Sequence, residues 1–180
     1  MNDKTKLVTI QRSKGYEWRK SFTVEEIGQL ISFIKSIKPD VICMVDNCYG
    51  EFVETIEPSQ VGADLVVGSL IKNPGGGLAP IGGYIVGKKE YVEHAANRLT
   101  APGLGKEVGA TLGVTPSLIQ GLFQAPQVVN GSLKTALFAA KVYDALGFGV
   151  LPTPQEKRAD IVQLIRFGAA DKMISFCKGI

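Results

Sequence analysis

The chain has 180 residues, a hydrophobic fraction of 45%, and 20 Lys and Arg against 17 Asp and Glu, which gives a net charge of +3. This hydrophobic fraction excludes a disordered tail, and so small a charge excess gives no reason to expect nucleic acid or a membrane surface as a partner. Three cysteines without a CxxC spacing and one histidine, His94, argue against a disulfide framework and a His-based zinc site.

The start of the chain predicts a β-α-β unit. The β-branched run Leu7–Ile10 indicates a strand, and Thr23 with Glu26 forms a capping box. Apolar residues then follow at helical spacing, namely Ile27, Leu30, Ile31 and Ile34. Pro39 ends that helix, and the continuous apolar run Val41–Val45 is typical of a strand buried on both faces of a parallel sheet. The crossover should be right-handed.

Further strands and helices are expected along the chain. The patterns predict strands at Leu65–Ser69 and Gly82–Gly87, a helix over Lys88–Leu99 and a glycine-rich loop over Pro102–Gly113. The longest stretch without a charge, 108–133, is too rich in Gly, Pro and polar residues to span a membrane. The polar N-terminus, residues 1–6, does not resemble a signal peptide, so a cytoplasmic protein is expected.

The last third of the chain predicts mainly helices. One long helix is expected from about Gln127 to Leu146, where Gly147 ends it. Two prolines at 152 and 154 then mark a boundary. Short helices are expected at Asp160–Phe167 and Asp171–Cys177.

Asp46 and Lys72 are the strongest candidates for chemistry. Each follows a predicted buried strand, and ligands of parallel α/β sheets bind at the carboxyl ends of strands. The ordinary alternatives are a turn or cap aspartate and a solvated turn lysine. A Mg²⁺-binding aspartate would need a phosphate-binding loop, and Gly105-Lys106 is followed by Glu107 rather than Ser or Thr. A lysine and an acid in one crevice instead indicate a pyridoxal phosphate (PLP) site.

Four segments carry a resemblance to a known family. They are VDNCYGEF at 45–52, GSLIKNPGGG at 68–77, GGYIVG at 82–87 and RLTAPGLGKEVGATLG at 98–113. The sequence resembles, over nearly all of its length, the aluminium-resistance family of fold-type-I PLP-dependent carbon–sulfur lyases, which are similar to cystathionine β-lyases and methionine γ-lyases. The resemblance implies an α/β fold with three layers and a mainly parallel sheet, which is the large domain of PLP-dependent transferases.

The resemblance also implies residue roles. Lys72 would hold PLP as the internal aldimine and then act as the base at Cα, and Asp46 would pair with the pyridinium nitrogen. Tyr49 would hydrogen-bond the 3′-oxygen of the cofactor, and Ser69 would contact the phosphate. Ile71 stands where cystathionine lyases usually carry a hydroxyl residue, so one phosphate contact is in doubt.

Other residues near the predicted strand ends receive simpler interpretations. Gln11 and Arg12, at the end of the first strand, are further candidates to face the cofactor. Cys43 is expected to pack in a buried strand, Cys48 to fill space in the site loop, and His94 to lie on the surface.

The resemblance implies that the chain is the central segment of a protein about twice as long. Residues 1–125 would belong to the PLP-binding large domain, 126–147 to a linking helix, and 148–180 to the start of a small C-terminal domain. The expected function is a carbon–sulfur lyase that acts on a sulfur amino acid by β- or γ-elimination, in a homo-oligomer. The alternative is a non-catalytic fragment or scaffold that keeps the fold and binds no cofactor.

Overall fold

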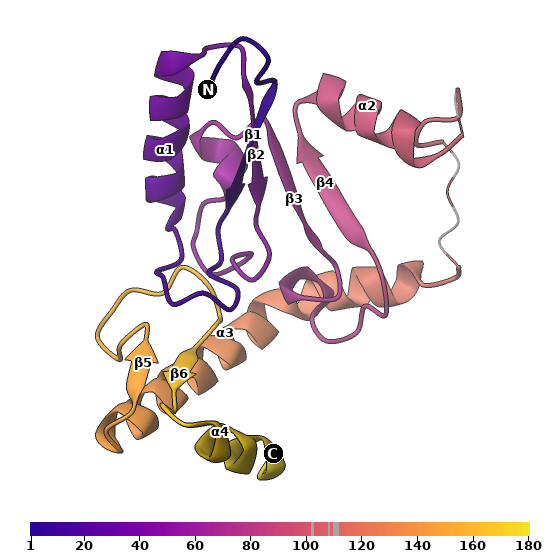
Figure 1. Cartoon of the computed structure of the whole chain (residues 1–180). Helices are drawn as coiled ribbons and strands as arrows, with labels where there is room; N and C mark the ends of the chain where they lie inside the picture. The colour runs from indigo at the N-terminus through magenta and orange to yellow at the C-terminus, as the bar shows by residue number, and fades with distance from the viewer. Residues whose placement is uncertain (102, 108, 110–111) are drawn as a thin grey trace.

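The computed structural model describes residues 1–101, 103–107, 109 and 112–180. A four-stranded sheet has the order β1-β2-β3-β4, with β1 to β3 parallel and β4 antiparallel (Figure 1). Its strands are β1 (Leu7–Gln11), β2 (Ile42–Asp46), β3 (Leu65–Ser69) and β4 (Gly83–Gly87). The α-helices are α1 (Val24–Ile37), α2 (Lys89–Leu99), α3 (Thr115–Ala145) and α4 (Ala170–Lys178). The predicted mixed α/β fold with a mostly parallel sheet is confirmed.

Helix α1 begins where the capping box predicts. The Thr23 side chain accepts from the Glu26 amide, and the Glu26 carboxylate accepts from the Thr23 amide at 2.8 Å. The buried face of α1 packs on the sheet to form the core, because its apolar residues recur at helical spacing. This core contains Ile10, Ile27, Ile31, Ile34, Val41, Cys43, Val45, Ala63 and Val66. The expectation that Cys43 packs inside a strand is therefore confirmed.

The opposite face of the sheet is less covered by the described residues. The register pairs Gln11 with Asp46 and Asp46 with Val67, so these three side chains share the face that does not bear α1. Gln11 is exposed, and Asp46 and Val67 are half-buried. The third layer implied by the resemblance thus stays a prediction.

Helix α3 begins at Thr115, so the expected start near Gln127 is wrong. Pro126 lies inside this helix of 31 residues, although proline usually ends or kinks one. One row of α3 residues is buried, so tertiary packing supports this helix on both sides of Pro126. The buried residues are Gly121, Ala125, Val129, Ala136 and Ala140. As Figure 1 shows, α3 crosses the end of the sheet where β1 to β3 finish.

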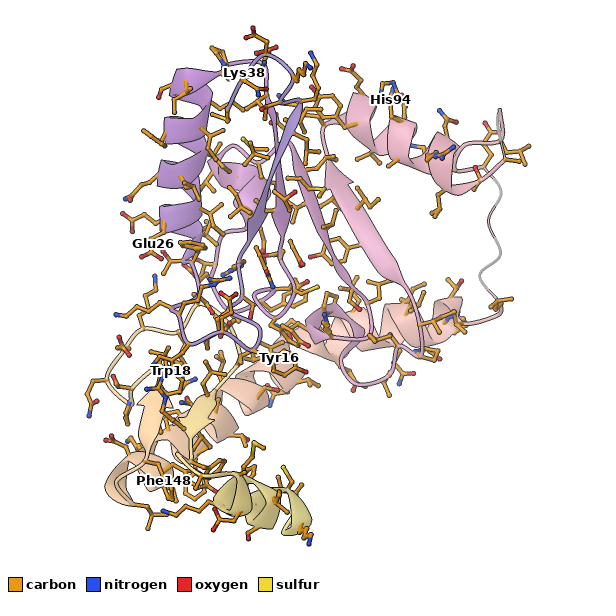
Figure 2. The ribbon with its side chains drawn as sticks, in the orientation of Figure 1. Tyr16, Trp18, Glu26, Lys38, His94 and Phe148 are labelled. Atoms are coloured by element: carbon orange, nitrogen blue, oxygen red, sulfur yellow. The ribbon has the colours of Figure 1, made fainter. Side chains whose placement is uncertain are left out.

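The C-terminal part holds a small antiparallel pair, β5 (Gly149–Leu151) and β6 (Leu164–Arg166), followed by α4. A helix over Asp160–Phe167 was expected, and this is wrong, since Leu164–Arg166 form β6. The Asp160 carboxylate is buried and accepts hydrogen bonds from Ser13 and Lys14 of the N-terminal part. Trp18 lies beside the strand pair, with the Arg166 guanidinium 4.1 Å from its ring centroid (Figure 2).

The remaining expectations concern the surface and one loop. His94 is exposed on α2, as expected (Figure 2). The expected loop over 102–113 lies partly outside the described residues, because 102, 108, 110 and 111 are not among them. Among the helices of the described residues, none combines the length and apolar character needed to cross a membrane.

Candidate active site at the ends of β2 and β3

Asp46 is the last residue of β2, and Tyr49 lies in the loop that follows it at the carboxyl end of the sheet. The Asp46 carboxylate accepts from the Cys48 amide at 3.0 Å, and the Asn47 amide donates to the Val67 carbonyl at 2.9 Å. Tyr49 adopts a left-handed backbone conformation with φ of 69°, which is uncommon for a residue other than glycine. Its carbonyl accepts from the Ile161 amide at 3.1 Å, so the C-terminal part helps to hold this loop.

Lys72 lies in the turn between β3 and the 3-10 helix η2 (Asn73–Gly75). Its Nζ is 4.5 Å from the centroid of the Tyr49 ring, and its side chain is half-buried. The Lys72 amide donates to the Ser69 carbonyl at 3.3 Å, which closes the turn. Ser69 lies two residues after Val67 on β3, so its side chain shares the face of Asp46. The structure therefore brings Lys72 and Tyr49 into contact, with Asp46 and Ser69 on the neighbouring strand ends.

The charges around Lys72 favour its protonated form. Partial burial lowers the pKa of Lys72, but the neighbouring Cys48, Tyr49 and Asp46 together outweigh burial, so this pKa lies above its usual value. Burial and the Asp46 carboxylate raise the pKa of the Cys48 thiol. Cys48 was interpreted as a space-filling residue, yet it contacts both Lys72 and Asp46. The one feature of the sequence that indicated a place for Cys48 in the site is its position between Asp46 and Tyr49.

Behind this loop lies a buried polar cluster, which we define as Arg12, Asn47, Glu51, Glu54, Glu57 and Tyr84. The Arg12 guanidinium is 0% exposed; it donates to Asn47 at 2.8 Å and to Glu54 at 3.1 Å. Arg12 was a candidate to face the cofactor, and the structure places its charged end in this cluster instead. Gln11 does share the face of Asp46, so its assignment stays a prediction.

Two glycines leave room for the cluster. A Cβ at Gly50 would lie 2.4 Å from the Arg12 Nε, and a Cβ at Gly68 would lie 2.6 Å from a Glu51 carboxylate oxygen. These distances are far below contact distance, so larger residues at either position would displace the cluster. Gly50 of VDNCYGEF and Gly68 of GSLIKNPGGG therefore serve the packing behind the site.

Glu51 is a buried carboxylate of the cluster whose hydrogen bonding is incomplete among the described residues. It is 4% exposed, and its Oε1 accepts from the Tyr84 hydroxyl at 2.8 Å. Its buried Oε2 has no hydrogen-bond partner among the described residues. Burial raises the pKa of Glu51 from 4.5 to about 6, although the Tyr84 hydrogen bond opposes the shift. The same carboxylate, together with burial, raises the pKa of Tyr84.

Glu51→Gln is expected to remove one component of the pH dependence of stability. Between pH 4.5 and 6 the folded chain holds a proton on Glu51 that the unfolded chain has lost, so stability falls as the pH rises through this window. Above pH 6 the cost is about 2 kcal/mol, at 1.36 kcal/mol per pKa unit. Urea unfolding at pH 4 to 7 should therefore show the variant gaining about 2 kcal/mol relative to the wild type as the pH rises.

The matched control is Glu90→Gln on α2, where the side chain is exposed. This substitution leaves the buried cluster intact, so the variant should keep the loss of stability that Glu51 causes between pH 4.5 and 6. If Glu51→Gln keeps that loss as well, Glu51 does not ionise with a raised pKa in the folded chain.

The chain is similar to known proteins over its whole length. A family model described as methionine gamma-lyase matches residues 1–180. The uncharacterized protein YnbB of Bacillus subtilis is 52% identical over 180 residues, which are all of this chain and 43% of that protein. A crystal structure from Clostridium acetobutylicum, of a protein proposed to be a cystathionine beta-lyase involved in aluminium resistance, is 53% identical with a TM-score of 0.96. It is matched over 99% of this chain and 42% of its own chain.

A carbon-sulfur lyase involved in aluminium resistance from Clostridium novyi is 51% identical, with a TM-score of 0.91 and coverage of 96% of this chain and 41% of that one. An aspartate aminotransferase from Thermus thermophilus, 13% identical with a TM-score of 0.59, shares the fold alone.

The chain belongs to the methionine gamma-lyase family, whose model it matches from end to end. The resemblance noted in the sequence is thereby confirmed. The chain spans less than half the length of YnbB and of the two clostridial proteins.

Proposed function

We propose that the chain is the lysine- and aspartate-bearing part of a PLP-dependent carbon–sulfur lyase that acts on a sulfur amino acid. The observation that carries this proposal is the Lys72 amine, which lies 4.5 Å from the Tyr49 ring and is influenced by the Asp46 carboxylate. The family, and the clostridial relative named as a carbon-sulfur lyase, support the same reaction class.

The chemistry of these side chains fits PLP. A primary amine can join an aldehyde, a carboxylate can pair with a pyridinium nitrogen, and a hydroxyl can bind a phosphate oxygen. Lys72, Asp46 and Ser69 supply these groups from two adjacent parallel strands and the turn that follows. Tyr49 adds a phenol from the loop that begins directly after Asp46.

PLP, when bound, supplies a sink for the electrons left on the substrate after Cα loses its proton. Lys72 would hold the cofactor through its amine and would move the Cα proton. Asp46 would keep the ring nitrogen protonated by charge pairing. Tyr49 would hydrogen-bond the 3′-oxygen, and Ser69 would hold the phosphate.

The raised pKa of Lys72 predicts how PLP capture depends on pH. Only the neutral amine attacks an aldehyde, and neighbouring groups keep Lys72 protonated at neutral pH. The rate of covalent PLP capture should therefore rise about tenfold per pH unit between pH 7 and 9. Stopped-flow absorbance of the full-length protein measures this rate. The same measurement on the Lys72→Ala variant gives the rate at which the other lysines capture PLP. A rate at Lys72 that is constant over this range would show a neutral amine already at pH 7.

The substrate class is tested with cystathionine, methionine and cysteine. Elimination at Cβ of cystathionine, with one water consumed, yields pyruvate, ammonia and homocysteine, whereas elimination at Cγ yields 2-oxobutyrate, ammonia and cysteine. The proposal expects one of these keto acids from the PLP-loaded full-length protein. A protein that binds PLP but releases neither keto acid from any of the three substrates would contradict the lyase assignment. One that binds no PLP would favour the non-catalytic scaffold.

The organisation of the longer protein is part of the same proposal. We assign residues 1–125 to the large domain, 126–147 to the linking helix and 148–180 to the start of the small domain, although α3 already begins at Thr115. A cytoplasmic homo-oligomer is the expected form. Size-exclusion chromatography with light scattering tests the oligomeric state, and a monomer at micromolar concentration would contradict it.

A further inference from the structure

A buried hydrogen bond joins the two segments that carry the site. Asn73, the residue after Lys72, is 4% exposed, and its side-chain amide donates to the main-chain carbonyl of Glu51 at 3.0 Å. Glu51 lies two residues after Tyr49 in the loop that follows β2. This hydrogen bond, together with the contact between Lys72 and Tyr49, joins the Lys72 turn to the Tyr49 loop.

Each of the tied segments is also fixed at a second point. On the loop side, the Glu51 carboxylate accepts from Tyr84 of β4. On the turn side, η2 packs so closely on α3 that a Cβ at Gly76 would lie 2.3 Å from the Gly121 carbonyl oxygen. The Asn73 bond lies between these two anchors, directly after Lys72 in the turn and two residues from Tyr49 in the loop.

A contribution to the free energy of folding does not explain why a buried asparagine stands at position 73. Its Nδ2 is paired, but its Oδ1 is buried and has no partner among the described residues. An unpaired buried acceptor costs about as much as one hydrogen bond gains. The net contribution of this side chain to folding is therefore small, and what it provides is a fixed geometry.

We propose that Asn73 is a positioning residue that holds the Lys72 amine against Tyr49 and Asp46 by binding the Glu51 carbonyl. This proposal rests on the proposed function in that it assigns Lys72 to PLP. The position itself, however, can be measured without cofactor. Asn73 acts through the backbone of the two segments and touches neither substrate nor PLP in this account.

Asn73→Leu tests the proposal, because leucine has a similar volume and cannot donate a hydrogen bond. Competitive acetylation with acetic anhydride between pH 7 and 11, followed by peptide mass spectrometry, gives the pKa of Lys72 in the full-length protein without PLP. In the variant this pKa should fall from its raised value toward that of an ordinary lysine, because Cys48, Tyr49 and Asp46 no longer lie beside the amine. The dissociation constant of PLP should rise about tenfold, as expected for a displaced reacting group.

Asn97→Leu on α2 is the matched control, since Asn97 is exposed, and it should change neither quantity. If Asn73→Leu lowers the melting temperature but leaves the Lys72 titration and PLP affinity as in the wild type, Asn73 is only structural and the proposal is overturned. If the Asn73→Leu variant does not fold, the same measurements are made on Asn73→Ala. A wild type that binds no PLP refutes the proposed function, whereas the Lys72 titration still decides the role of Asn73.

Discussion

Replacing Lys72 by alanine should reduce elimination activity roughly 10³-fold or more in the PLP-loaded full-length protein, because under the proposed function the substitution removes both the covalent attachment and the proton-transfer group. The fold should survive, since the Lys72 side chain is only half-buried. Keto acid production from the best of the three sulfur amino acids measures the effect. The melting temperature should stay close to that of the wild type.

Lys106→Ala is the control, because Lys106 is an exposed lysine outside the site. It should retain full activity. A Lys72→Ala protein that turns over substrate within tenfold of the wild-type rate would refute the catalytic assignment of this lysine. If the Lys72→Ala protein loses activity and also unfolds, the activity measurement is repeated with Lys72→Arg. Arginine keeps the charge and the length but cannot join an aldehyde at neutral pH.

Replacing Gly121 by alanine should destabilise the protein by about 3 kcal/mol, at the upper end of the usual range for overpacking. A Cβ at this position of α3 would lie 2.1 Å from the Gly75 carbonyl oxygen, so the helix and the Lys72 turn would have to move apart. Denaturant unfolding measures the loss. Since the turn moves with η2, PLP affinity should fall as well.

Gly131→Ala on the same helix is the matched control. Nothing lies within 4 Å of a Cβ built at Gly131. The alanine should therefore stabilise α3 by about 0.5–1 kcal/mol through its higher helix propensity. If the two alanine variants change stability in the same direction by similar amounts, α3 does not pack on the Lys72 turn as closely as described.

The sheet and the positions of its catalytic candidates were predictable because they depend on short patterns. The capping box at Thr23 and the apolar runs locate α1 and β2, and parallel strands place Asp46 and Ser69 on one face. These patterns are local, and tertiary packing did not override them.

The parts that escaped prediction depend on contacts between distant residues. The long helix was expected to start near Gln127, whereas α3 begins at Thr115, because its buried row of residues can be recognised only once the surface on which it packs is known. Arg12 and Glu51 belong to a buried polar cluster assembled from three parts of the chain, and the bond from Asn73 to the Glu51 carbonyl leaves no signature in the sequence.

The most direct test of the account is to find which lysine PLP joins. The full-length protein is incubated with PLP, reduced with borohydride, digested and mapped by mass spectrometry. We expect the label on Lys72. The natural competitor is Lys14, whose pKa burial lowers and whose Nζ lies 3.0 Å from an Asp160 oxygen. A label on Lys14 or another lysine, with Lys72 unmodified, would contradict the central claim.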